Sequence, residues 1–254
     1  RLGVIGIKQA IRLEWMQKTV NLMLAGLDSK EIRNELHQYI ASQYGTSETS
    51  ERSDKTRAFL VGNLMRIWVS PDSELLAFRD ASLACLRDAP EWSLPIHWAM
   101  ISSVYPFWFN VARQTGRLLA LQDRATQVQI INRLKEQYGD RQTISRYAQY
   151  VLRSLIAWGV LLDTDTRGCY AKQAAQTIDR QEVAVLLCES ALYATQAPKL
   201  ALSVVQGNPA FFPFHIPNLT GSRIAYLSRR IDEIRYGVGD DFLMLSERRL
   251  SQKS

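Results

Sequence analysis

The chain has 254 residues, of which 46% are hydrophobic and 22% are charged, and a formal net charge of +6. This composition excludes an intrinsically disordered chain and a fibrous repeat protein, and the length allows one large or two modest domains, each with its own core. The positive charge favours an anionic partner.

The first hundred residues carry the periodicity of a helical bundle. We predict a first helix over residues 8–25 and a second that Asp28 or Ser29 caps and that runs to about residue 42. A polar loop over 45–54 follows, and then helices over 55–69 and 72–86. The first two helices flank Gly26 and resemble a helix-turn-helix. The second of them contains Glu31, Glu35 and a single arginine, so we interpret the pair as a packed helical hairpin.

Residues 92–112 form a stretch of 21 residues without a charge, about the length of a membrane span. Pro106 would break a spanning helix near its middle, and other polar residues interrupt the stretch. We therefore predict a buried aromatic cluster and no membrane segment. Its members would be Trp98, Tyr105, Phe107, Trp108 and Phe109.

Residues 107–172 follow the order of a winged helix-turn-helix: three helices and a hairpin. We predict the helices over 107–123, 125–139 and 141–159, with Gly139 and Gly159 as stops and Asp140 as the cap of the third. The hairpin would occupy 160–172. The apolar positions facing the core would be Phe109, Ala112, Leu118 and Leu121 in the first helix, Val128, Ile131, Leu134 and Tyr138 in the second, and Ile144, Tyr147, Val151, Leu155 and Trp158 in the third.

The opposite face of the third helix is polar and basic, and its residue types hydrogen-bond to base edges and phosphates. Between Arg113 and Lys172 the chain has ten Lys and Arg against five Asp and Glu, so +5 of the net charge falls in this stretch. We predict a DNA-binding site made of Arg141, Gln142, Thr143, Ser145, Arg146, Gln149 and Arg153 on the helix, with Arg167 and Lys172 on the hairpin.

The last part of the chain is predicted to contain a strongly apolar helix over 179–197, suited to a core or an oligomer interface. An aromatic segment broken by prolines follows over 207–217, for which core packing under a loop is the favoured interpretation and a peptide-binding or stacking platform the alternative. We predict a final helix over 222–236 and a strand over 241–245.

No catalytic cluster can be assembled from the sequence. The three histidines, His37, His97 and His215, lie in unrelated segments, and no phosphate-binding loop, dinucleotide fingerprint or nucleophile elbow is present. We therefore expect no enzyme, no metal and no cofactor. Three widely spaced cysteines without a CxxC pair, and an opening segment unlike a signal peptide, indicate a cytoplasmic protein.

Two segments carry a resemblance to a known family. The sequences LMLAGLDSKEIRNEL and FNVARQTGRLLALQDRATQVQIINRLKEQYGDRQTISRYAQYVLRSLIAWGVL resemble the opening helix pair and the winged-helix region of the BrxA family of BREX phage-defence systems, over roughly residues 15–160. The resemblance implies an accessory subunit that binds duplex DNA, without catalysis, beside other proteins of the defence system. The chain departs from the family by an added C-terminal stretch from about Ile178.

These features predict a mainly α-helical protein: an N-terminal helical bundle over 1–104, a winged helix-turn-helix domain over 105–175 and a helical C-terminal extension over 176–254. The expected partners are duplex DNA, other defence-system proteins and further copies of the chain. Two other functions stay open: a winged-helix transcriptional regulator, and an interaction scaffold whose winged helix binds protein.

Overall fold

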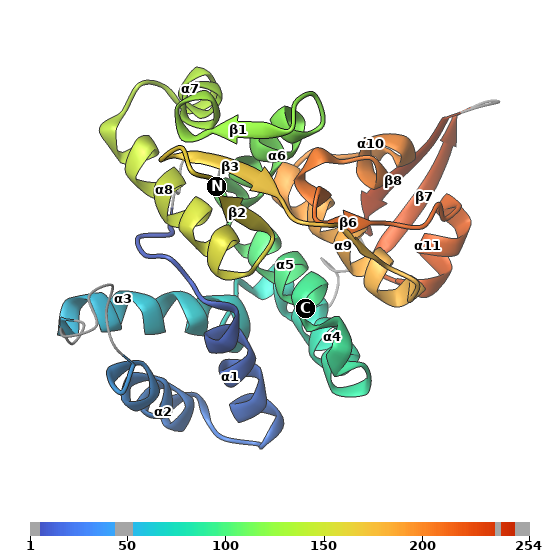
Figure 1. Ribbon diagram of the computed structural model, residues 1–254. Helices are drawn as coiled ribbons and strands as arrows, with labels where there is room; N and C mark the ends of the chain where they lie inside the picture. Colours follow the sequence, from blue (N-terminus) through green and yellow to red (C-terminus); the bar gives the residue numbers. More distant parts are fainter. Residues whose placement is uncertain (1–5, 44–52, 237–239, 247–254) are drawn as a thin grey trace.

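The computed structural model describes residues 6–43, 53–236 and 240–246, and it is mainly helical with three small sheets (Figure 1). The prediction of a mainly α protein is thereby confirmed. In the view of Figure 1 the first three helices lie at the lower left, residues 124–172 at the upper left and the C-terminal elements at the right.

The N-terminal region consists of helices with short connections. They are α1 (Leu13–Leu24), α2 (Ser29–Ala41), α3 (Asp54–Leu64), the short π-helix η1 (Met65–Val69), the 3₁₀ turns η2 (Ser73–Leu75) and η3 (Pro90–Trp92), and α4 (Leu76–Asp88). Asp28 caps α2, as predicted, and exchanges hydrogen bonds with Glu31 in a capping box. Most of the predicted loop over 45–54 lies outside the described residues.

The prediction of a first helix over 8–25 was wrong at its start. The helix begins at Leu13, and residues 6–12 before it are not helical. Ile7 and Ile11 in this segment are fully buried, so tertiary packing and not helical periodicity places their side chains in the core.

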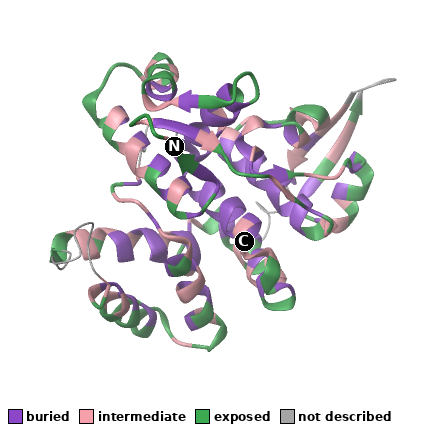
Figure 2. Ribbon diagram, in the orientation of Figure 1, coloured by how far each residue is buried: buried purple, intermediate pink, exposed green. Residues whose placement is uncertain are grey.

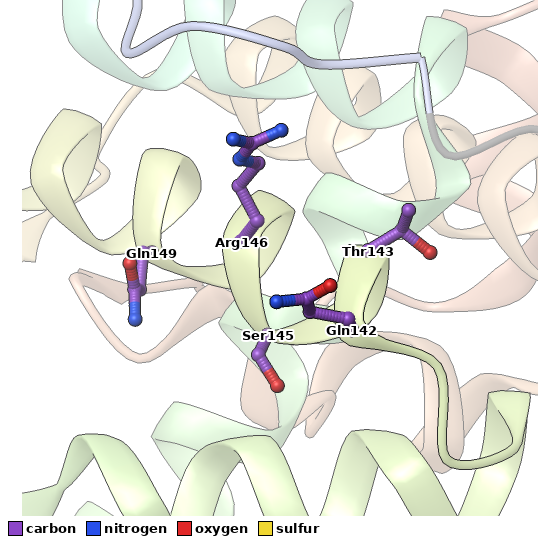
Figure 3. Close-up of a pocket in the computed structure, with 5 residues that line it drawn as sticks. All are labelled: Gln142, Thr143, Ser145, Arg146 and Gln149. Atoms are coloured by element: carbon purple, nitrogen blue, oxygen red, sulfur yellow. The ribbon is translucent and has the colours of Figure 1, made fainter.

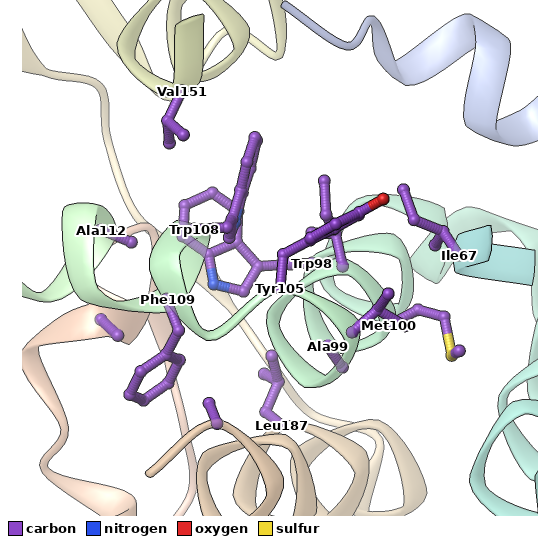
Figure 4. Close-up of a cluster of buried hydrophobic side chains, with 14 of the residues drawn as sticks. Ile67, Trp98, Ala99, Met100, Tyr105, Trp108, Phe109, Ala112, Val151 and Leu187 are labelled. Carbon is purple, nitrogen blue, oxygen red and sulfur yellow. The ribbon is translucent and has the colours of Figure 1, made fainter. Parts of the chain in front are cut away.

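The uncharged stretch forms two helices, α5 (Ser93–Val104) and α6 (Pro106–Leu119), which break at Tyr105 before Pro106. The predicted aromatic cluster is buried as expected. In Figure 4 the side chain of Phe109 extends toward the helix that carries Leu187, and that of Trp108 extends toward Val151. None of the helices within the described residues combines the length and the apolar character needed to cross a bilayer.

Residues 124–172 form two helices and a three-stranded antiparallel sheet. The elements are β1 (Arg124–Thr126), α7 (Gln127–Tyr138), α8 (Gln142–Ala157), β2 (Leu161–Asp163) and β3 (Cys169–Lys172), and the strand order is β1-β3-β2. Thr126 pairs with Cys169, and Asp163 pairs with Tyr170 on the other side of β3. The predicted hairpin is therefore present, with an additional strand that the sequence did not indicate.

The C-terminal region mixes helices with short strands. It contains β4 (Gln176–Thr177), α9 (Gln181–Thr195), β5 (Leu200–Ala201), α10 (Leu202–Gln206), η4 (Pro209–Phe211), β6 (Phe214–His215), α11 (Gly221–Leu227), β7 (Ile231–Tyr236) and β8 (Asp240–Leu245). β4 pairs with β6 in parallel, and β8 lies between β5 and β7 in an antiparallel sheet. The predicted strand over 241–245 is confirmed as part of β8.

Two C-terminal predictions were wrong. The last helix ends at Leu227 and not at residue 236, because residues 231–236 pair along their whole length with β8. Strand pairing with a distant partner here overrides the local helical pattern. The C-terminal extension is consequently a mixture of helices and strands and not a helical one.

The aromatic segment packs in the core, as the favoured interpretation predicted. The ring of Phe214 lies 5.5 Å from that of Trp98, edge to face, and Phe211 packs in the same way on Phe109 at 5.9 Å. Burial is concentrated where α5, α6 and α9 meet (Figure 2). One continuous cluster of buried side chains joins all three predicted regions, so this core supports the elements on either side of it.

Candidate nucleic-acid interface

The two faces of α8 differ in burial and in chemistry. The buried face contains Ile144, Ala148, Val151 and Leu155, all fully inaccessible to solvent, and Trp158 just beyond the helix is 5% exposed. The predicted core positions of this helix are thus confirmed, apart from Tyr147, which is half-buried. The buried face holds α8 against the molecule and leaves the opposite face to solvent.

The solvent side of α8 carries the predicted site residues at helical spacing. Gln142, Arg146, Gln149 and Arg153 follow one another at steps of three and four, so they form a single stripe along about three turns of helix. Gln142, Thr143, Arg146 and Arg153 are exposed, and Ser145 and Gln149 are half-buried. The sequence prediction that these side chains share one face is borne out by their burial pattern.

A cavity of about 360 Å³ lies against this stripe and is lined by Gln142, Thr143, Ser145, Arg146 and Gln149. Figure 3 shows that all five project from consecutive turns of α8, with Arg146 extending to one side and Ser145 and Gln149 to the other. The lining therefore offers a guanidinium group, two amides and two hydroxyl groups, and these donors and acceptors suit base edges and phosphates.

The N-terminus of α8 carries a positive partial charge that no side chain caps. Arg141 is the N-cap residue, and its side chain makes no capping hydrogen bond. The prediction that Asp140 caps this helix was wrong, because its carboxylate pairs instead with Lys135, 2.8 Å away. Arg141 is exposed, so its charge adds to that of the helix terminus.

The β2–β3 hairpin lies beside α8 and presents two cations. Its tip is closed by hydrogen bonds from the Thr164 N–H to the Cys169 carbonyl (3.1 Å) and from the Cys169 N–H to the Thr166 carbonyl (3.0 Å). Gly168 adopts a φ of +72° there, a conformation that favours glycine. Arg167 at the tip and Lys172 at the base are both exposed.

Arg153 on α8 influences the pKa of Tyr170 on the hairpin. Burial raises the pKa of the Tyr170 hydroxyl, the Asp163 carboxylate raises it further, and the positive charge of Arg153 lowers it. Arg153 on α8 is thus within electrostatic reach of the hairpin. The Tyr170 hydroxyl donates a hydrogen bond to Gln127 Oε1 (3.1 Å), which anchors the sheet to the start of α7.

Two predicted core positions beside the site proved to be exposed. Val128 is 65% exposed and Leu121 is 82% exposed, whereas Ile130 is fully buried. Leu121 is exposed because α6 ends at Leu119 and Leu121 lies in the turn that follows. Val128 is exposed because Thr126 and Gln129 form a capping box that starts α7 at Gln127, and the helix then turns Ile130, Ile131 and Leu134 towards the core. β1 immediately before this cap is the element that sequence periodicity missed.

The five cations of the candidate interface have no acidic partner in the part of the chain that the structure describes. Arg141, Arg146, Arg153, Arg167 and Lys172 form no ion pair with any carboxylate among residues 6–43, 53–236 and 240–246. Exposed acidic residues nearby are Asp163 and Asp165 on the hairpin. The balance of charge on this face is positive and suits a polyanion.

Comparisons with known proteins do not identify a relative. Neither the protein-family models, nor the curated proteins, nor the solved structures contain a match to this chain.

Proposed function

We propose that the chain binds duplex DNA through α8 and the β2–β3 hairpin, without catalysis, as an accessory component of a bacterial phage-defence system. The observation that carries the DNA-binding proposal is the stripe of amides and guanidinium groups on α8 next to two unpaired cations on the hairpin. The defence role follows from the resemblance to the BrxA family.

The order of elements supports the interpretation of residues 106–172 as a winged helix. α6, β1, α7, α8, β2 and β3 follow one another in the chain, and the sheet order is β1-β3-β2. In a winged helix the second helix of the helix-turn-helix enters the major groove with its N-terminal residues, and the hairpin contacts the backbone. α8 and the β2–β3 hairpin hold these two places.

The proposed contacts divide by chemistry. Gln142, Arg146 and Gln149 present groups that read base edges, since amides pair with adenine and guanidinium groups with guanine in the major groove. Arg153, Arg167 and Lys172 would hold phosphates. Arg141 and the uncapped N-terminus of α8 would hold a further phosphate.

The small number of cations sets the expected strength of binding. Four or five neutralised phosphates give a slope of about −4 when the logarithm of the binding constant is plotted against the logarithm of salt concentration. The affinity of one chain is therefore modest at physiological salt. Recruitment by a partner, or several chains on one DNA, would raise it.

Fluorescence anisotropy with labelled duplexes tests the proposal. We expect binding at low salt that an Arg141/Arg146/Arg153→Ala variant loses by at least tenfold. A matched control, Arg33/Arg87/Arg229→Ala, removes three exposed arginines from other parts of the surface and should bind nearly as well as the wild type. Equal binding by both variants, or no binding of any duplex by the wild type, would overturn the assignment.

The range of sequences bound separates a defence subunit from a transcriptional regulator. A regulator prefers its own operator over other DNA by on the order of a thousandfold or more, whereas an accessory subunit of a defence system is expected to show little preference. The neighbouring genes give an independent test, because a defence subunit should be encoded beside other components of the system.

A further inference from the structure

Half of the cations between Arg113 and Lys172 lie away from the proposed DNA-binding face. They are Arg113, Arg117, Arg124, Arg133 and Lys135. Lys135 pairs with Asp140, but none of the four arginines forms an ion pair with a carboxylate in the part of the chain that the structure describes. The α8 site therefore does not account for these four positive charges.

Three of these arginines follow the seam between α6 and α7. The helices run in opposite directions: Asn110 bonds to the Tyr138 hydroxyl near one end of the seam, and residues 120–126 join the helices at the other end. Between these points Arg113 Nη2 donates to Gln137 Oε1 (3.4 Å). Arg117 lies one turn further along α6 and Arg133 one turn back along α7, so both flank the same seam.

The proximity of Arg113 and Arg117 at the seam is electrostatically unfavourable in the unbound protein. Burial lowers the pKa of the Arg113 guanidinium, and the positive charge of Arg117 lowers it further. Arg113 Nε is buried and has no hydrogen-bond partner among the described residues. The acidic residues nearby, Glu136 on α7 and Asp123 in the connection between the two helices, are exposed, and neither forms an ion pair with these arginines in the described part of the chain. An anion bound at the seam would relieve this repulsion.

We propose that Arg113, Arg117 and Arg133 form a second phosphate-binding surface, with which one chain holds a second segment of duplex DNA. The inference rests on the proposed function, because the first segment is the one held by α8. Guanidinium groups fit the oxygens of phosphates in a bidentate manner, which suits a DNA backbone.

The direction of the seam indicates a second duplex and not more of the first. Arg133 and Lys135 are two residues apart on α7, hence about 200° apart around the helix. Lys135 faces the turn into α8, where it meets Asp140, and Arg133 is on the side of Gln137 and α6. The two cationic surfaces consequently flank α7 on opposite sides.

Sedimentation velocity with the full chain and duplexes of ~15 base pairs, which are far shorter than the persistence length and cannot bend around α7 to reach both surfaces, measures how many duplexes one chain binds. We expect two for the wild type at low salt. An Arg113/Arg117/Arg133→Gln variant should bind one, an Arg141/Arg146/Arg153→Ala variant should also bind one, and the combined variant should bind none.

Two controls address folding and charge. Arg117/Arg133→Gln leaves the half-buried Arg113 intact and should weaken the second duplex at least fivefold, while Arg117/Arg133→Lys should restore much of it. Arg33/Arg87/Arg229→Gln removes as much charge elsewhere and should keep both duplexes.

Each outcome decides between the proposals. One duplex for the wild type, lost in the α8 variant, would overturn the second surface and keep the proposed function. If only the seam variant loses DNA binding, the assignment of α8 as a DNA-binding site is overturned and the assignment of the seam is retained. Polyglutamate serves as a second probe, in place of DNA, for an acidic protein partner. If the seam variant still binds two duplexes but no longer binds polyglutamate, the seam is a site for an acidic protein and the inference is wrong.

Discussion

The indole N–H of Trp158 donates a hydrogen bond to the carbonyl oxygen of Ile11, 2.9 Å away and 147 residues earlier in the chain. The N–H of Ile11 donates in turn to Ser154 Oγ, also at 2.9 Å. Both backbone groups of one fully buried residue are thus bound to the C-terminal end of α8 and its C-cap residue. The irregular segment before α1 thereby joins the N-terminal helices to the helix that carries the candidate interface.

Trp158→Phe should lower the free energy of unfolding by about 1–3 kcal/mol, because the buried Ile11 carbonyl loses its donor. Ser154→Ala tests the second bond and should also destabilise the protein. Urea unfolding measures both changes. Tyr226→Phe is the control, since its side chain is 77% exposed, and it should leave the midpoint unchanged. An unchanged midpoint in Trp158→Phe would contradict the prediction.

Gly116→Ala should destabilise the protein by about 1–3 kcal/mol, the usual range for overpacking. A Cβ at this position would overlap the carbonyl oxygen of Pro209, a backbone atom that cannot move aside freely. Gly62→Ala is the matched control, because a Cβ there meets no atom within 4 Å. Gly62 lies in the last turn of α3, which continues directly into η1, so this change should be neutral or stabilising by up to about 1 kcal/mol. Thermal unfolding of the two variants should shift in different directions.

Glu189→Gln should cost about 3–5 kcal/mol of stability, because it leaves the charge of a mostly buried arginine without its partner. The Glu189 side chain is fully buried and accepts hydrogen bonds from Arg230 Nε (2.7 Å), Arg230 Nη2 (2.8 Å) and Ser228 Oγ (3.0 Å). Glu182→Gln removes a mostly exposed carboxylate and should change stability by less than about 1 kcal/mol. Similar denaturation midpoints for the two variants would refute this role of Glu189.

His97 should make the protein less stable in mild acid. Complete burial lowers the pKa of this imidazole from 6.5 to about 3, so below pH 6.5 the unfolded chain binds a proton that the folded chain does not. The free energy of unfolding should fall by up to about 1.4 kcal/mol for each pH unit between these two values. Above pH 6.5 the contribution of neutral His97 to the free energy of unfolding is fully retained.

Urea unfolding of the wild type and of His97→Gln at about pH 7.5 and pH 5.5 measures this contribution. Glutamine can still hydrogen-bond to Gln17, which lies 3.1 Å from His97 Nε2. The variant should therefore show a smaller loss of stability on acidification. Parallel pH profiles would assign the acid sensitivity to other groups.

Substitutions on the candidate interface should separate phosphate contacts from base contacts. Arg167→Gln at the hairpin tip should weaken binding equally for all DNA sequences and reduce the magnitude of the salt slope by about 1. Gln149→Ala on α8 should change the ranking of sequences and leave the salt slope unchanged. A selection from random duplexes and a salt titration for each variant provide the two measurements. A change in ranking caused by Arg167→Gln would contradict the assignment.

Local signals predicted α8 and the hairpin well. Gly139, Gly159 and Gly168 adopt positive φ angles where the chain changes direction, and glycine is the residue that allows this. The apolar spacing of Ile144 and Val151 identified the buried face of α8 before any contact was known. Both kinds of signal arise within a few residues of the chain, which is why a sequence displays them.

The wrong predictions concern positions where two local arrangements compete. Val128 matched the helical period but lies outside the packed face of α7, and Asp140 could have capped α8 but pairs with Lys135. In each case two local arrangements were available. A contact within a few residues selected one of them, the Thr126–Gln129 capping box at the start of α7 and the Lys135–Asp140 ion pair before α8, and apolar periodicity alone does not distinguish between such alternatives.

The amino-acid sequence by itself determined the mainly helical character, the two faces of α8, the cations along the solvent face and the turn of the hairpin, because periodicity and glycine conformation act over short distances. Only the tertiary structure decided that β1 joins β3, that residues 231–236 form a strand with β8, and that Ile11 binds to α8. These choices depend on partners far along the chain. Their energy comes from pairing and burial that no single segment possesses.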